Sequence, residues 1–262
     1  MNILKMELKS LYKTMLIWTV AIVATFMLFT IGIFPIFEEK TELVMQMMAG
    51  MPEEFLDAFG FGMDSFTYFE DFYGFTYFYL AIMGAIAASL MTIRTFGKEK
   101  QYKAQDFLFT KPISRTKIFV NKALAVVLVL GGSNLIFIPC SIYCFLENGI
   151  EDSAVLASCA LLFLELFCVS LGIFLTVFMR KIRSSASIAT GIGFLLFAIN
   201  SVINLLDIEA AKYLSPFQYY DPGTLFEEGS YDMTLVIFSI VVMVMFVGVS
   251  FYKYTTNDIE SV

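Results

Sequence analysis

The 262-residue sequence contains no histidine, and only 16% of its residues are charged. Without histidine it lacks the side chain that most often serves as a general base or a zinc ligand. The four cysteines show no CxxC pair or other metal-binding spacing, so we interpret them as small apolar packing side chains: Cys140, Cys144, Cys159 and Cys168.

The sequence also has no GxxxxGK[ST] loop for binding nucleotide phosphates. The polar segments between its apolar runs are too short to build a nucleotide-binding domain. We therefore expect a chain that is not an enzyme and that carries no cofactor or metal of its own.

Long apolar runs dominate what is present, because 58% of the residues are hydrophobic. Such a composition is too apolar for a soluble domain of this length. Each of six runs is close to the ~20 residues that a helix needs to cross ~30 Å of hydrocarbon, and separate spans in lipid must be helical. We predict one all-α membrane domain over residues 1–262, with spans at 15–37, 72–96, 120–145, 154–179, 186–206 and 234–252.

Basic residues lie on alternate sides of these spans. Of the 17 Lys and Arg residues, only Lys40 and Lys212 fall in the other set of loops, where most of the 24 Asp and Glu residues lie. This positive-inside pattern predicts a multi-pass protein with both termini in the cytoplasm. The basic residues follow the membrane surface and form no separate patch for nucleic acid.

Residues 1–14 are predicted to form an interfacial helix on the inner leaflet. Lysines recur every four residues, at Lys5, Lys9 and Lys13, and apolar side chains group on the opposite side of the helical wheel. Glu7 falls on that apolar side, so its carboxylate must extend to water or meet a partner. At the outer start of the second span, the aromatic residues between Phe66 and Tyr79 predict a belt at the membrane interface.

The inner loop 97–119 is the longest and carries the densest charge. Phe107, Leu108 and Phe109 form an apolar cluster in it, ahead of Pro112. Full burial of the three side chains would contribute about 5 to 9 kcal/mol as an upper bound, at ~1.5 to 3 kcal/mol each. The cluster either docks into a partner's groove or folds back onto the bilayer surface.

This loop, with its glutamate, its acidic-aromatic-aliphatic cluster and the run from Lys111 through Pro112 to Arg115, resembles the permease subunits of type-2 ABC exporters. The resemblance covers the whole chain, although Lys103 to Asp106 lack the glycine common in that family. In the family, the loop holds a coupling helix that docks on the ATP-binding subunit. The resemblance implies that role for Glu99, Asp106, Phe107, Leu108, Pro112, Ser114 and Arg115.

What the resemblance implies is an exporter of a peptide, a drug-like or a lipid-like molecule in the plasma membrane of a bacterium. ATP and Mg²⁺ would be bound by two copies of a separate ABC ATP-binding subunit. A second permease subunit, identical or homologous, would complete the pathway. Small residues in the second and fifth spans favour close helix contacts within or between subunits: Ala81, Gly84, Ala85, Ala88, Ser187, Ala189, Gly191 and Gly193.

Three polar side chains within the spans are candidates for the pathway. Glu165 is the one acidic residue inside a span, where it is either functional or a hydrogen-bonded carboxyl between helices. Asn200 and Asn204 share a helix face, and such amides, like Asn134, more often connect helices than bind substrate.

The segment 213–222 combines two prolines with four aromatic residues, which predicts a short re-entrant or interfacial helix pair. By resemblance, Pro216, Phe217, Tyr219 and Tyr220 form an external gate, and anchoring in the interfacial aromatic belt is the alternative.

Two other function classes stay open: a sensor or immunity module with a permease fold, and a membrane-embedded enzyme, for which the sequence shows no GxGD, HExxH or serine-nucleophile motif.

Overall fold

The computed structural model describes residues 3–52, 68–101, 114–206 and 209–256, and every regular element in these ranges is a helix. Six helices are long and apolar enough to cross a membrane, which confirms the predicted all-α fold with six spans. They are α1 with its continuation through η1 and α2 (Ile3–Glu39), α5 (Phe69–Gln101), α7 (Arg115–Glu147), α8 (Ala154–Phe178), α9 (Ser185–Leu206) and α12 (Met233–Thr256).

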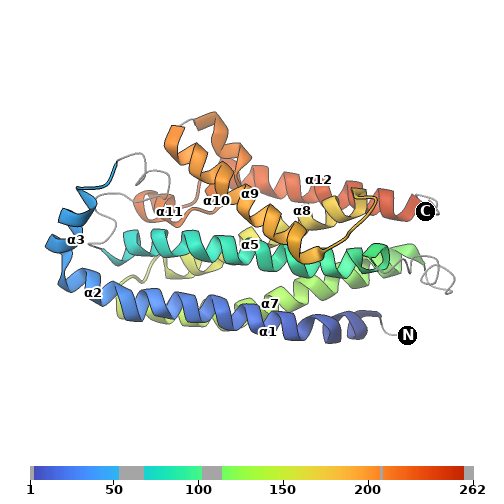
Figure 1. Cartoon of the computed structure of the whole chain (residues 1–262), viewed down its shortest axis with the longest axis horizontal. Helices are drawn as coiled ribbons and strands as arrows, with labels where there is room; N and C mark the ends of the chain where they lie inside the picture. Colours follow the sequence, from blue (N-terminus) through green and yellow to red (C-terminus); the bar gives the residue numbers. More distant parts are fainter. Residues whose placement is uncertain (1–2, 53–67, 102–113, 207–208, 257–262) are drawn as a thin grey trace.

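The long helices lie side by side along the long axis of the molecule (Figure 1). α5 runs through the middle and is the most buried of the six, with 72% of its apolar window covered, against 17% for α12. The described residues also form four short helices: α3 (Thr41–Met48), η2 (Glu209–Leu214), α10 (Pro216–Tyr219) and α11 (Pro222–Glu228). Of these, α3 and α11 lie near the end opposite the termini.

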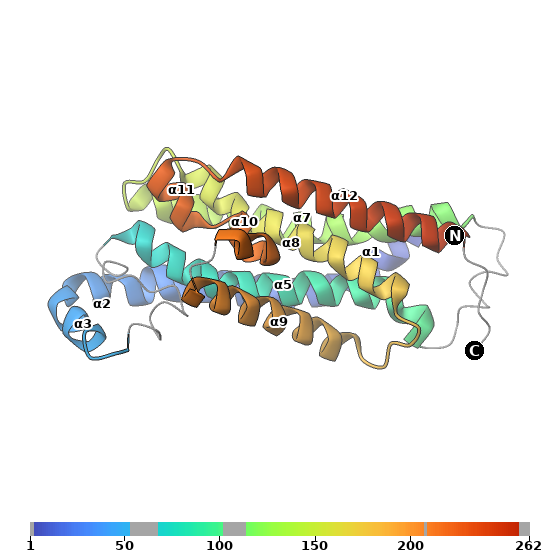
Figure 2. The same ribbon diagram turned by 90° about the horizontal axis from the view of Figure 1, so that it is seen from above.

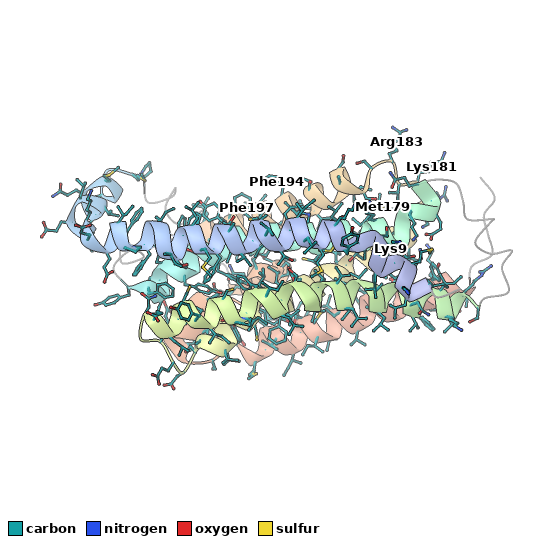
Figure 3. All side chains as sticks on the ribbon, turned by 90° about the horizontal axis from the view of Figure 1, so that it is seen from below. Lys9, Met179, Lys181, Arg183, Phe194 and Phe197 are labelled. Carbon is teal, nitrogen blue, oxygen red and sulfur yellow. The ribbon has the colours of Figure 1, made fainter. Side chains whose placement is uncertain are left out.

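Both termini lie at one end of the bundle (Figure 1), and Figure 3 shows Lys9, Lys181 and Arg183 at that end. We call it the basic end, and the opposite end, with α3 and α11, the acidic end. α5 and α7 have 33 residues each. At ~1.5 Å per residue they are ~50 Å long, so they extend beyond ~30 Å of hydrocarbon. Their extra turns at the basic end extend into the predicted 97–119 loop, so residues 97–101 and 115–119 of it are helical.

The first fourteen residues differ from the prediction in one respect. From Ile3 onward they continue into α1 (Ile3–Met27) without a break, so residue 14 is not a helix boundary. No glycine or proline, two of the common causes of a sharp helix kink, occurs in this stretch. The predicted position on the inner membrane surface stays a prediction.

Span one changes its helical geometry near the acidic end. Residues Leu28–Ile33 form a π-helical turn, η1, in which the N–H of Phe34 donates to the carbonyl of Phe29. α2 (Phe34–Glu39) follows, with Pro35 in its first turn. A proline ring clashes with the carbonyl four residues earlier in an α-helix, and the wider π turn relieves that clash.

The aromatic residues at the start of α5 point inward as well as outward. Phe72 and Tyr73 are fully buried, whereas Tyr68 is 64% exposed. Tyr73 meets Phe26 and Phe145 edge-to-face, at centroid distances of 6.2 and 4.6 Å. The interfacial belt predicted for this region is therefore wrong for Phe72 and Tyr73, which belong to the core joining α1, α5 and α7.

Candidate functional site

The last four residues of α5, Lys98 to Gln101, each contact a different neighbouring helix or its flanking turn. We call these four residues the α5 hub. The hub lies at the basic end and forms residues 98–101 of the 97–119 loop, in the part of it that is helical. Figure 2 shows how α5 lies among its neighbours there.

Lys98 connects the hub to α1. Its ammonium lies 2.5 Å from the carboxylate of Glu7, which is only 1% exposed. A buried carboxylate needs such a partner, because an unpaired charge in apolar surroundings is strongly destabilising. The sequence predicted that the Glu7 carboxylate either extends to water or meets a partner, and the structure shows that it meets a partner.

Glu99 connects the hub to α7. Both of its carboxylate oxygens lie 2.6 Å from the ammonium of Lys122, which also donates to the Thr95 carbonyl at 2.7 Å. Lys122 is 1% exposed. The pair therefore joins the two helices on either side of residues 102–113, and it does so away from water.

Lys100 and Gln101 connect the hub to the α8–α9 turn. The Lys100 ammonium donates to the carbonyls of Thr176, Val177 and Met179, at 2.7, 3.0 and 2.8 Å. These carbonyls lie at the end of α8, where no N–H of the same helix can donate to them. The lysine supplies the missing donor, and its positive charge complements the negative end of the helix dipole. Gln101 accepts a hydrogen bond from Ser185, the first residue of α9.

The predicted coupling residues fall into two groups. Asp106, Phe107, Leu108 and Pro112 lie outside the described residues. Glu99 faces Lys122, as above, and Ser114 caps the first turn of α7, where its hydroxyl accepts from the N–H of Lys117 at 3.3 Å. Arg115 is the first residue of α7.

Glu165 lies between α5, α7 and α8 near the middle of the bundle. Its carboxyl is 1% exposed and accepts a hydrogen bond from Asn134 Nδ2 at 2.6 Å, and this amide also donates to the Leu130 carbonyl. Gly84 makes room on α5, because a Cβ there would lie 2.7 Å from Leu161 and 3.4 Å from Glu165. Asn134 thus connects helices, as such amides often do.

Asn200 and Asn204, the other two pathway candidates, bind the same side chain. Gln218 Nε2 of α10 donates to Asn200 Oδ1 at 2.9 Å and to Asn204 Oδ1 at 2.8 Å. Asn200 also accepts from the Ser215 hydroxyl at 3.0 Å. These amides fasten α10 to α9.

The predicted gate residues are buried under this contact: Pro216, Phe217, Tyr219 and Tyr220. Tyr220 stacks on Phe163 with centroids 5.3 Å apart, and Tyr219 meets Phe167 edge-to-face at 5.5 Å. Burial raises the pKa of Tyr219 to about 12, so its phenol stays protonated and donates to the Tyr213 carbonyl. The segment packs on α8, α9 and α12, and both its gate role and its anchoring at the membrane interface stay predictions.

Sequence reasoning missed Lys98, Lys100, Gln101, Lys122 and Gln218 as site residues. Lys122 could have been found from the sequence, because it is a lysine inside a predicted span. Ionisable residues in spans are costly and are usually paired or functional. Within the described ranges, no group of three or more His, Cys, Asp or Glu side chains is placed to hold a metal, and the four cysteines are free thiols.

We expect Gln218→Leu to detach α10 from α9. Loss of the donor leaves Asn204 Oδ1 without this partner, at a cost of about 1–3 kcal/mol. Thermal unfolding in detergent should show a Tm lower by several degrees, at about 2–4 °C per kcal/mol. Leu214→Ala, at a neighbouring side chain that is 68% exposed, is the control and should leave Tm unchanged. Equal Tm values for the two variants would contradict the assigned role of Gln218.

Comparison with known proteins identifies the family of this chain. The family profile described as ABC-2 family transporter protein matches residues 1–259. No curated protein and no solved structure matches the chain. Because the profile covers nearly the whole chain, the protein belongs to the ABC-2 family of transporter proteins and is a membrane permease component of an ABC transporter.

Proposed function

We propose that this chain is the permease subunit of an ATP-driven exporter and that a separate ATP-binding subunit docks on its 97–119 loop. The observation that carries the proposal is the α5 hub at the root of that loop. A partner that displaces the loop also displaces the end of α5, and the hub is bonded to the ends of four other spans. A loop anchored in this way is suited to transmit movement from a soluble motor to the membrane.

The working assembly has two permease subunits, identical or homologous, and two ATP-binding subunits that hold ATP and Mg²⁺. Their binding side is the cytoplasm, and the membrane is a bacterial plasma membrane. The shared position of both termini and the basic residues at one end of the bundle supports this orientation, because basic loops stay in the cytoplasm.

The proposed substrate is a peptide, a drug-like or a lipid-like molecule. Glu165 is the proposed polar group beside the pathway, since it is the acidic side chain held inside a span, between three helices. The α10 segment is proposed to act as the external gate, with Asn200 and Asn204 holding it through Gln218.

Phe107→Ala/Leu108→Ala should abolish recovery of the ATP-binding subunit. Removing both side chains takes away two-thirds of the apolar cluster, whose burial contributes ~1.5–3 kcal/mol per side chain. The tagged chain is purified from its native membrane in mild detergent, and co-purifying soluble proteins are identified by mass spectrometry.

The matched control is Leu43→Ala/Met47→Ala, which truncates two exposed side chains of α3 at the acidic end. It should retain the ATP-binding subunit. If no ABC ATPase accompanies the unchanged chain, the proposal is wrong. If the ATPase binds the Phe107/Leu108 variant as well, the docking site lies elsewhere.

A further inference from the structure

The α5 hub places four contacts around a single helical turn. Consecutive helical residues project ~100° apart, so four in a row cover the whole circumference. Lys98 reaches α1, Glu99 reaches α7, Lys100 reaches the end of α8, and Gln101 reaches the start of α9. Such an arrangement is available only where a helix end is surrounded by its neighbours, as α5 is.

We propose that the α5 hub is the transmission element of the transporter, which makes the basic ends of α1, α7, α8 and α9 move together with α5. This inference rests on the proposed function, because the docked ATP-binding subunit supplies the movement. It also assigns Glu99 and Lys122 as positioning residues inside the permease, and leaves docking to the rest of the 97–119 loop.

The contacts are of a kind that transfers movement. Lys122 and Glu7 are each 1% exposed, so separating either from its partner would leave a charge in apolar surroundings. Exposed ion pairs separate easily because water replaces the partner. Lys100 likewise holds three carbonyls that end α8. A displaced α5 end therefore carries its neighbours with it.

Movement at the hub also has a continuous route to the acidic end. α5 and α8 meet at the Lys100 contacts, again where Gly84 faces Glu165, and again where the Tyr73 hydroxyl donates to the Ala157 carbonyl at 3.2 Å. Contacts at both ends and in the middle make the two helices one rigid pair. The acidic end should therefore respond when the basic end is displaced.

The test measures hydrogen–deuterium exchange in the purified complex of this chain with its ATP-binding subunit, in lipid nanodiscs, with and without ATP and vanadate. In the unchanged complex, trapping should alter exchange in peptides from α3 and α11 at the acidic end. With Lys122→Met, that response should fall about fivefold or more, the lower limit of the ~5–150-fold range typical of coupled sites. The ATP-binding subunit should still be recovered.

Two variants serve as controls. Lys117→Met removes the same charge from an exposed position on the same helix and should respond like the unchanged complex. Lys122→Arg keeps a cation for Glu99 and should restore most of the response, which a defect in folding alone would not require. If Lys122→Met does not assemble, Glu7→Gln tests the contact with α1, since it removes the buried charge and leaves a lysine, Lys98, that is already 25% exposed.

An unaltered response in Lys122→Met, or in Glu7→Gln where that variant replaces it, would overturn the transmission role while leaving the proposed function intact. Absence of an ATP-binding subunit from the unchanged complex would overturn the proposed function and this inference with it. Because the test uses ATP and vanadate as probes, it does not require the transported substrate.

Discussion

Gly193→Leu should strongly reduce the yield and thermal stability of the folded protein. A Cβ at Gly193 would overlap the Ile86 side chain of α5, so a leucine there forces α9 away from α5. Overpacking of this kind costs about 1–3 kcal/mol, and occasionally more. Thermal unfolding and monodispersity in detergent measure the effect.

Gly191→Leu is the matched control, since Gly191 lies two residues away on α9 and a Cβ there has nothing within 4 Å. It should behave like the unchanged protein. Ile86→Ala should partly restore stability to Gly193→Ala by removing the atoms that the new methyl group meets. Equal losses for the two leucine variants would show that α9 does not pack on α5 through Gly193.

Asn134→Leu should destabilise the protein because it leaves the buried Glu165 carboxyl without its donor. The cost of such an unsatisfied group is about 1–3 kcal/mol, and ~3–5 kcal/mol if the group is charged. Replacing both partners by apolar residues of similar size can be nearly neutral. Asn134→Leu/Glu165→Leu should therefore recover most of the lost stability.

A double-mutant cycle of unfolding free energies measures this coupling. Additive losses from the two single variants would mean that the 2.6 Å contact between Asn134 and Glu165 contributes nothing. The double variant has a second use, because it is expected to be stable without the carboxyl. Transport by this variant would remove Glu165 from the pathway, whereas assembly without transport would support its place there.

Hydropathy was sufficient to predict the six spans, because crossing a membrane imposes a length and a composition that each segment satisfies locally. Hydropathy does not say which helices are neighbours. The periodicity of the N-terminal segment placed Glu7 on the apolar face, but its partner Lys98 lies 91 residues away. Choosing among the lysines of the basic end required the packing of α1 against α5.

The predicted aromatic belt at the start of α5 was wrong for a related reason. Phe72 and Tyr73 have the composition of an interfacial belt, yet they are fully buried in the core. Rings at an interface and rings in a core look alike in a sequence. Asn200 and Asn204 were recognised by their spacing on one helix face, whereas nothing in the sequence around Gln218 marked it as the α10 residue that joins them.

The π-helical turn at Leu28–Ile33 changes the rotational setting of the part of span one that follows it. One residue more or fewer rotates the following helix by ~100°. The extra residue in this turn therefore decides which face α2 presents. Phe34 meets Phe69 and Phe72 at 5.2 Å each because of it, while Thr19 keeps its own partner, Ser133, below the turn. Beyond the turn, span one thus presents Phe34 to α5, a side chain that a uniform α-helix of the same sequence would turn away by ~100°.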